Sequence, residues 1–109
     1  MEGRLDDVIV RGAENLSPGE IEDTLVTHPA VAEAGVVGIP DDEWGETVAA
    51  VVVLKPGAET TAEELQGWTR ARLRSSRTPT VIRFRTELPY NETGKLLRRV
   101  LRADLSGPG

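Results

Sequence analysis

Lys95 stands at the end of a short polar segment, Pro89-Tyr-Asn-Glu-Thr-Gly-Lys95, whose residue types could serve chemistry. Gly94, directly before it, can adopt a positive φ and lets the backbone approach a ligand closely. A lysine at such a turn is a mobile point charge with three donors, suited to a phosphate or a carboxylate. Because the same residue types also mark plain turns, the segment indicates an anion site only together with other features of the chain.

The charge is unevenly distributed along the chain, whose formal net charge is −5. Residues 1–69 contain 15 acidic and 3 basic residues, whereas residues 70–102 contain 10 basic and 2 acidic residues. One interpretation is that the last third of the chain faces an anion. The other is that its arginines simply solvate exposed helix and strand faces. The pattern alone leaves both open.

The length of 109 residues predicts a single domain, residues 1–109, with one core and little room for a large enzyme pocket. The chain has no cysteine, which excludes a disulfide framework and a cysteine-based metal site. A single histidine, His28, argues against a histidine-rich metal site, so we expect no metal site. No apolar run approaches the ~20 residues of a membrane span. The first residues do not resemble a signal peptide, so we expect a cytoplasmic protein.

The expected order of elements is β-α-β-β-α-β-α, with a hairpin in the middle. The pattern predicts strands at 8–10, 31–39, 47–54 and 81–85, and helices at about 17–28, 60–73 and 96–105. The run 47–54 is nearly all apolar and is typical of a strand in the middle of a sheet. The order predicts an α+β domain with a small, mainly antiparallel three-stranded sheet packed with about three helices.

Capping residues and small residues refine this prediction. Ser17 can cap the first helix, Pro18 suits its first position, and Glu20 can close a capping box. Thr60 or Thr61 caps the second helix.

Helix and strand faces indicate the packing. Ile21 and Leu25 share one face of the first helix, and Trp68 is expected in the core at helical spacing. Gly35 and Gly38 allow a close backbone approach or a bulge in the first long strand.

Four segments in chain order resemble the C-terminal domain of the adenylate-forming superfamily, which includes acyl- and aryl-CoA synthetases, peptide-synthetase adenylation domains and luciferases. Gly3–Asp7 is similar to the hinge motif of that family, and Gly12–Glu22 to the segment that follows it. Asp41–Glu46 resembles the acyl-CoA branch, and Leu88–Arg99 resembles the terminal lysine motif. The resemblance covers about residues 3–103. Four motifs in the right order are far more specific than any one of them.

The resemblance implies the C-terminal lid of an AMP-forming carboxylate–CoA ligase. In that family a large N-terminal domain binds ATP with magnesium and the carboxylic acid, and the lid works with it in cis or in trans. The acid attacks the α-phosphate of ATP, giving an acyl-adenylate and pyrophosphate. The lid then swings, and the thiol of coenzyme A attacks the acyl carbon. Since the phosphate loop of the large domain has no counterpart in this sequence, we expect the isolated chain to be inactive.

Residue roles also follow from the resemblance. Lys95, in the loop 89–99, matches the lysine that contacts the carboxylate and the α-phosphate side during adenylation. Asp6, in the segment 3–7, matches the hinge residue, and Arg4 matches an arginine near the nucleotide. The alternatives from the residues alone are that Asp6 belongs to a turn and that Arg4 is a solvated surface residue.

Coenzyme A is expected to contact four residues. From the resemblance, Trp44 and Arg77 are the best candidates for contacts to its nucleotide, with Gly12 and Ala13 beside the pantetheine arm. The family usually has a second glycine where Ala13 stands, so an extra methyl group could narrow this path. The structural alternatives are that Trp44 covers the sheet edge and that Arg77 is a surface linker residue.

Three other functions compete with this interpretation. The chain could be the lid of a peptide-synthetase-type enzyme that works with a carrier protein. It could be a nucleic-acid-binding module, as the basic last third suggests, but aromatic residues are only 4% of the chain and offer few stacking platforms. It could also be a regulatory protein that keeps the lid fold, although the presence of Lys95 argues against lost catalysis. Because stacking platforms for bases are few, we expect no nucleic-acid partner.

Overall fold

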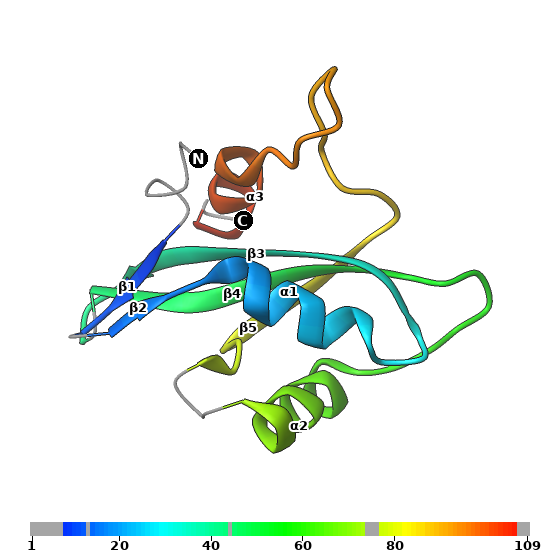
Figure 1. Cartoon of the computed structure of the whole chain (residues 1–109), viewed down its shortest axis with the longest axis horizontal. Coiled ribbons are helices and arrows are strands. Elements are labelled where there is room, and N and C mark those ends of the chain that lie inside the picture. Colours follow the sequence, from blue (N-terminus) through cyan, green and yellow to red (C-terminus); the bar gives the residue numbers. More distant parts are fainter. Residues whose placement is uncertain (1–7, 13, 44, 74–76, 107–109) are drawn as a thin grey trace.

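The computed structural model describes residues 8–12, 14–43, 45–73 and 77–106. Its elements, drawn in Figure 1, are β1 (Ile9–Arg11), β2 (Glu14–Leu16), α1 (Pro18–Val26), β3 (Val31–Asp41), β4 (Gly45–Leu54), α2 (Ala62–Arg72), β5 (Val81–Arg85) and α3 (Arg98–Ser106). The expected α+β fold, with three helices around a small sheet, is confirmed within these ranges.

The main sheet has three strands in the order β3-β4-β5. β3 and β4 form an antiparallel hairpin in which Val37 lies opposite Ala49. β4 and β5 are parallel, with Val51 opposite Arg83, and α2 lies in the crossover that a parallel pair requires. β4 is therefore the central strand, as its apolar run predicts.

A second, two-stranded sheet consists of β1 and β2. The sequence does not indicate β2, because Glu-Asn-Leu lacks the β-branched and aromatic residues that mark strands. Its pairing with β1 places Ile9 opposite Leu16, and both side chains are buried. Backbone pairing with β1 and the burial of these two side chains therefore stabilise β2, although its local propensity is low.

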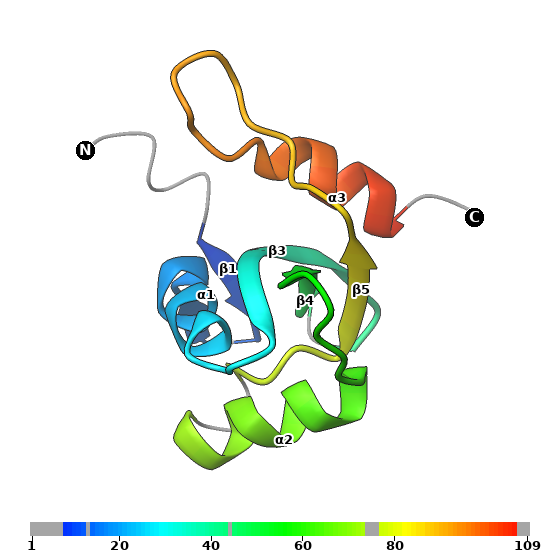
Figure 2. The same ribbon diagram turned by 90° about the vertical axis from the view of Figure 1, so that its right-hand side faces the viewer.

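Both faces of the main sheet are covered, which explains why β4 does not alternate between apolar and polar residues. Successive side chains of a strand point to opposite faces. Val48, Ala50 and Val52 therefore pack with the residues of α1 and α2 that include Ile21, Leu25 and Leu65. Ala49, Val51 and Val53 pack with α3 through Leu101 and Leu105. Figure 2 shows α3 on one side of the sheet and α2 on the other.

The glycines of β3 let neighbouring elements come close, as expected. A Cβ atom on Gly35 would lie 2.6 Å from Leu101 Cδ1 and 3.1 Å from Leu96 Cδ2. A Cβ on Gly38 would lie 2.9 Å from Glu46 Oε1, at the end of a flexible side chain. Any larger residue at position 35 would therefore force the Leu101 and Leu96 side chains to shift.

The starts of the three helices agree only in part with the caps and first residues that the sequence predicts. Pro18 is in the first turn of α1, and Ser17 is its N-cap, but the Ser17 side chain makes no capping hydrogen bond. Thr61 caps α2, where its hydroxyl oxygen accepts from the Glu64 amide at 3.1 Å. α3 begins at Arg98, two residues later than expected, because the Leu97 amide donates back to the Pro89 carbonyl at 2.9 Å.

Candidate functional site

The segment before α3 is a loop closed by its own hydrogen bonds. Gly94 has φ of 87°, so the positive backbone angle expected for this glycine is present. The Asn91 amide donates to the Lys95 carbonyl at 2.9 Å, and the Gly94 amide donates to the Asn91 carbonyl at 3.0 Å. The side-chain oxygen of Asn91 accepts from the Lys95 amide at 2.9 Å. The backbone at Lys95 is thus held on both sides.

The ends of this loop are tied to each other and to the sheet. Tyr90 and Leu96 form an isolated antiparallel bridge, and the Tyr90 hydroxyl donates to Glu33 Oε1 on β3 at 2.8 Å. Partial burial, the hydrogen bond to Glu33 and the negative charges of Glu33 and Glu22 raise the pKa of Tyr90 to about 12. In both views the segment between β5 and α3 extends away from the sheet, beyond α3 (Figures 1 and 2).

The Lys95 side chain contrasts with its backbone. It is exposed, and within the described part of the chain no group accepts a hydrogen bond from its ammonium. The result is an available cation on a backbone of defined shape, which is the arrangement that an approaching anion requires.

A buried ion pair anchors the start of α3. Arg98 Nη2 lies 2.7 Å from Glu22 Oε2 and 2.8 Å from Oε1, and the two side chains are only 17% and 16% exposed. Arg98 Nε also donates to the Val36 carbonyl at 3.1 Å, and the Val36 amide donates to Glu22 at 2.9 Å. One group of contacts thus joins α1, β3 and α3.

The basic last third is therefore not one surface for an anion. Arg98 pairs with Glu22, Arg85 with Asp104, and Arg102 Nε donates to the Gly38 carbonyl at 3.0 Å. The interpretation that all these arginines only solvate exposed faces is also incomplete, because several bond to other elements. Sequence reasoning missed these pairs, since nothing local to an arginine shows which distant acid it meets.

Arg77 lies between α2 and β5 and is also paired. Its Nε donates to Glu20 Oε1 of α1 at 3.0 Å, and the two side chains are 25% and 50% exposed. Arg77 and Glu20 line a surface pocket together with Ala71, Arg72 and Leu73. Arg77 is thus held at a groove between two helices rather than extended as a free linker side chain.

Gly12 forms the turn between β1 and β2 with φ of 61°. This hairpin lies beside the start of β4, because the Val10 amide donates to Glu46 Oε1 at 2.8 Å. The residues Arg4, Asp6, Ala13 and Trp44 lie outside the described residues, so the structure does not place them.

The described candidates do not form one cluster. The loop 89–97, which carries Lys95, lies at the top of both views, whereas α2 lies at the bottom, and residues 77–80 are on the same side of the sheet as α2 (Figures 1 and 2). The loop 89–97 and the segment 77–80 are therefore on opposite sides of the main sheet. The turn at Gly12 belongs to a third region, at the edge formed by β1, β2 and the start of β4.

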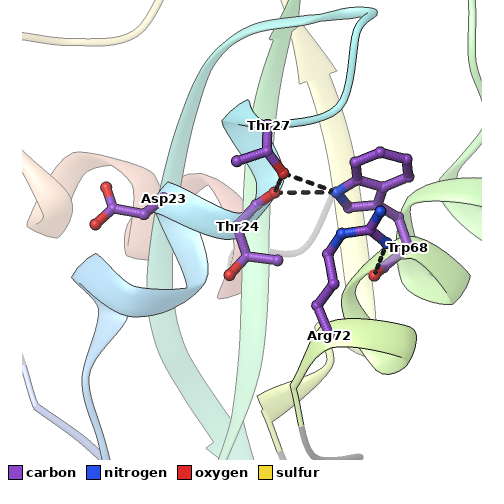
Figure 3. Close-up of a pocket in the computed structure, with 5 residues that line it drawn as sticks. All are labelled: Asp23, Thr24, Thr27, Trp68 and Arg72. Carbon is purple, nitrogen blue, oxygen red and sulfur yellow. Dashed lines mark hydrogen bonds between the residues drawn. The ribbon is translucent and has the colours of Figure 1, made fainter.

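The prediction that Trp68 is a core residue is wrong, since Trp68 is only half-buried. It lines a groove between α1 and α2 with Asp23, Thr24, Thr27 and Arg72, drawn in Figure 3. Its Nε1 donates to the Thr24 carbonyl at 3.1 Å and the Thr27 hydroxyl at 3.0 Å, and the Arg72 guanidinium carbon lies 3.4 Å from the ring centroid. An indole N–H needs such a partner, which keeps the ring at the helix–helix seam.

Within the described ranges, no group of three or more His, Cys, Asp or Glu residues lies close enough to hold a metal ion. None of the described helices is both long and apolar enough to cross a membrane.

The sequence of this chain matches a known family of protein domains. Residues 20–95 match the model of the AMP-binding enzyme C-terminal domain. A 2-succinylbenzoate–CoA ligase of Bacillus cereus (strain Q1) is 50% identical over 99 residues, which are 91% of this chain and 20% of the relative. The chain thus spans about a fifth of the length of this relative.

Solved structures of related proteins superpose well on this chain. A fatty acyl CoA synthetase of Mycobacterium tuberculosis superposes with a TM-score of 0.86 at 39% identity, covering 94% of this chain and 20% of that one. An amide bond synthetase of Marinactinospora thermotolerans superposes with a TM-score of 0.88 at 33% identity, covering 92% and 20%. The match to the family model extends over most of the sequence and ends at Lys95 itself, and on that evidence the chain belongs to the family of AMP-binding enzyme C-terminal domains.

Proposed function

We propose that this chain is the C-terminal lid of an AMP-forming carboxylate–CoA ligase, and that it supplies Lys95 to the adenylation step. The observation that carries the proposal is the Lys95 ammonium, which has no partner among the described residues, on a loop whose backbone is fixed by hydrogen bonds. The similarity to a CoA ligase and to a fatty acyl CoA synthetase supports it.

Lys95 suits this chemistry on electrostatic grounds. A carboxylate and the α-phosphate of ATP repel each other as they approach, and a cation between them offsets that repulsion and stabilises the charge that develops in the transition state. Gly94, next to Lys95 in the chain, has no side chain, so a phosphate can approach the backbone closely at this point. ATP and magnesium are bound mainly by the large N-terminal domain, which acts in cis or in trans.

The regions near Gly12 and Arg77 are proposed to face coenzyme A. The Arg77 side chain, at the groove beside α2, can grip a phosphate in two-point fashion once it leaves Glu20. Because the loop 89–97 and the segment 77–80 lie on opposite sides of the main sheet, one orientation of the lid does not present both segments to the same ligand. This supports a rotation of the lid between the two half-reactions, with Asp6 as its hinge and with Arg4, Ala13 and Trp44 in the roles that the resemblance implies.

The test joins this chain to the large domain of a CoA ligase and measures pyrophosphate release with ATP and a panel of carboxylic acids. We expect release from the two-domain protein and none from the isolated chain. Pyrophosphate release by the chain alone contradicts the proposal, and so does a two-domain protein whose adenylation does not depend on Lys95.

A second candidate differs in the acyl acceptor. The similarity to an amide bond synthetase favours an acceptor other than coenzyme A, namely an amine. A carrier-protein thiol, as in peptide synthetases, is the related alternative. Supplying the preformed acyl-adenylate with coenzyme A, an amine or a carrier protein in parallel, and identifying the acyl product, decides among the three.

A further inference from the structure

The loop that carries Lys95 is organised around a single side-chain atom, the Oδ1 of Asn91. This oxygen accepts from the Thr93 amide at 2.9 Å, the Thr93 hydroxyl at 2.7 Å and the Lys95 amide at 2.9 Å. The Asn91 backbone amide also donates to the Lys95 carbonyl at 2.9 Å. Both backbone polar groups of Lys95 are therefore bonded to Asn91.

We propose that Asn91 is the positioning residue for Lys95: its amide oxygen fixes the backbone from which the ammonium reaches its anion. This inference rests on the proposed role of Lys95 in adenylation. Asn91 itself touches no reacting atom in this scheme and acts only through Lys95.

The loop needs such a residue because core packing does not shape it. Residues 91–95 are all exposed, so no buried apolar contact fixes their conformation. Gly94 adds backbone freedom, since glycine has more conformations to lose than any other residue. The bonds at Tyr90, Leu96 and Leu97 close the ends of the loop but do not fix the residues between them. Two backbone bonds lie inside the loop, from the Asn91 amide to the Lys95 carbonyl and from the Gly94 amide to the Asn91 carbonyl. The three bonds to Oδ1 are the side-chain bonds that restrict the loop further.

The choice of asparagine has an electrostatic reason. An Asn side chain readily makes hydrogen bonds to the backbone two residues on, as it does to Thr93. An aspartate would accept the same three bonds, but it would place a negative charge beside the ammonium that has to meet an anion. A neutral acceptor shapes the loop and leaves the charge of Lys95 uncompensated.

The first test measures hydrogen exchange of backbone amides by NMR in the 109-residue chain. In Asn91→Ala, the Lys95 and Thr93 amides should exchange about five- to tenfold faster for each hydrogen bond lost. The amides of β4 should be unchanged, which shows that the fold persists. Glu92→Ala is the matched control, because Glu92 lies in the same loop, is exposed and makes no hydrogen bond within the described residues. Unchanged exchange at Lys95 in Asn91→Ala overturns the proposal.

The second test separates the half-reactions in the two-domain protein. Asn91→Ala should slow adenylation by about 10- to 100-fold, because small misplacements of a reacting group are costly. Thioester formation from preformed acyl-adenylate should keep its rate. Asn91→Asp should restore the slow amide exchange of Lys95 without fully restoring adenylation, and the remaining defect should depend on salt.

A double-mutant cycle distinguishes failure of this inference from failure of the proposed function. If Asn91 acts through Lys95, Asn91→Ala should add nothing to Lys95→Ala in the same protein. If Lys95→Ala leaves adenylation intact, the proposed function fails, while the exchange experiment still decides whether Asn91 holds the loop. If Lys95→Ala abolishes adenylation and Asn91→Ala does not slow it, or if the two effects multiply, the positioning role is wrong.

Discussion

Lys95 and Arg77 are both cations proposed to meet anions, yet the molecule holds them in opposite ways. At Lys95 the backbone is fixed by Asn91, and the ammonium has no partner within the described residues. At Arg77 the side chain itself is fixed, through its bond to Glu20.

The difference bears on what each cation does when a ligand arrives. An anion that reaches Lys95 breaks no bond to the described residues and meets a cation whose backbone is already held, which favours a transition-state role. A phosphate that reaches Arg77 has to replace a carboxylate that already satisfies one of its donors. Binding there is an exchange of partners, so the gain is small and depends on how well the phosphate fits the fork of the guanidinium.

The largest expected effect is that of Lys95→Ala in the two-domain protein. Removing a positioned electrostatic donor typically costs about 10²–10³ in rate, and we expect this loss in adenylation, measured as pyrophosphate release. Thioester formation from preformed acyl-adenylate should change far less. Equal losses in both half-reactions would mean that Lys95 supports the fold or an unrelated step.

Next in size is the effect of Arg98→Ala on stability. Glu20 and Glu22 lie on the same helix, but the pair with Arg98 is mostly buried and that with Arg77 is more exposed. Arg98→Ala leaves a mostly buried Glu22 without its cation and should lower the free energy of unfolding by about 3 kcal/mol.

Arg77→Ala is the control, and it should cost less than about 1 kcal/mol, because exposed pairs contribute little. Urea unfolding of both variants measures the difference. Similar losses in the two variants would contradict the view that the Arg98–Glu22 pair stabilises the fold while the Arg77–Glu20 pair can exchange its partner.

A smaller effect is expected from Glu20→Gln. Without the carboxylate, Arg77 is available to a phosphate, so the affinity of the chain for coenzyme A should rise by about twofold to tenfold, in line with the value of an exposed pair. Isothermal titration at low and high salt measures it, and added salt should shrink the gain. Arg70→Gln, an exposed arginine of α2 outside the pocket at Arg77, should leave the affinity nearly unchanged. A loss of affinity in Glu20→Gln would show that Glu20 helps binding.

The smallest effect concerns Tyr90, the only tyrosine of the chain. Its pKa is raised to about 12, by partial burial and by the bond and charge of Glu33. The folded state therefore holds the Tyr90 proton more tightly than the unfolded state does. The protonated hydroxyl makes its full contribution to the free energy of unfolding below the ordinary pKa of 10.0, and this contribution is lost as the pH rises through about 12. Phenolate absorbance follows the titration directly. In Glu33→Gln the pKa should move toward its ordinary value, and an unchanged titration would leave burial and the charge of Glu22 as the causes.

Much of the fold follows from local patterns, for reasons that particular residues make plain. The apolar run 47–54 has to be buried on both faces, so it predicts the central strand β4. Thr61 satisfies an amide at the start of α2, and Gly94 alone permits the φ that its turn requires. Each of these signals lies within a few residues of the feature that it predicts.

The rest depends on contacts between distant parts of the chain. Arg98 and Glu22 are separated by 76 positions, and Arg77 and Glu20 by 57, so no local pattern pairs them. The position of Trp68 depends on Thr24 and Thr27 of another helix. The direction of β5 relative to β4 is likewise a property of the assembled sheet, because a short alternating strand reads the same in either direction. Lys95 could be singled out from sequence, but the bonds of Asn91 that shape its loop could not.

The parallel pairing of β4 and β5 has a consequence for how the chain acquires its structure. β3 and β4 are joined by a short turn and can zip together early, whereas β5 can dock only after the crossover through α2 has closed a longer stretch of chain. The packing of α3 is expected later still, because α3 packs against Gly35, Val51 and Leu88, which come together only once the sheet has formed. We therefore expect the hairpin to assemble with α1 and α2 first, and the segment that carries Lys95 to become ordered last.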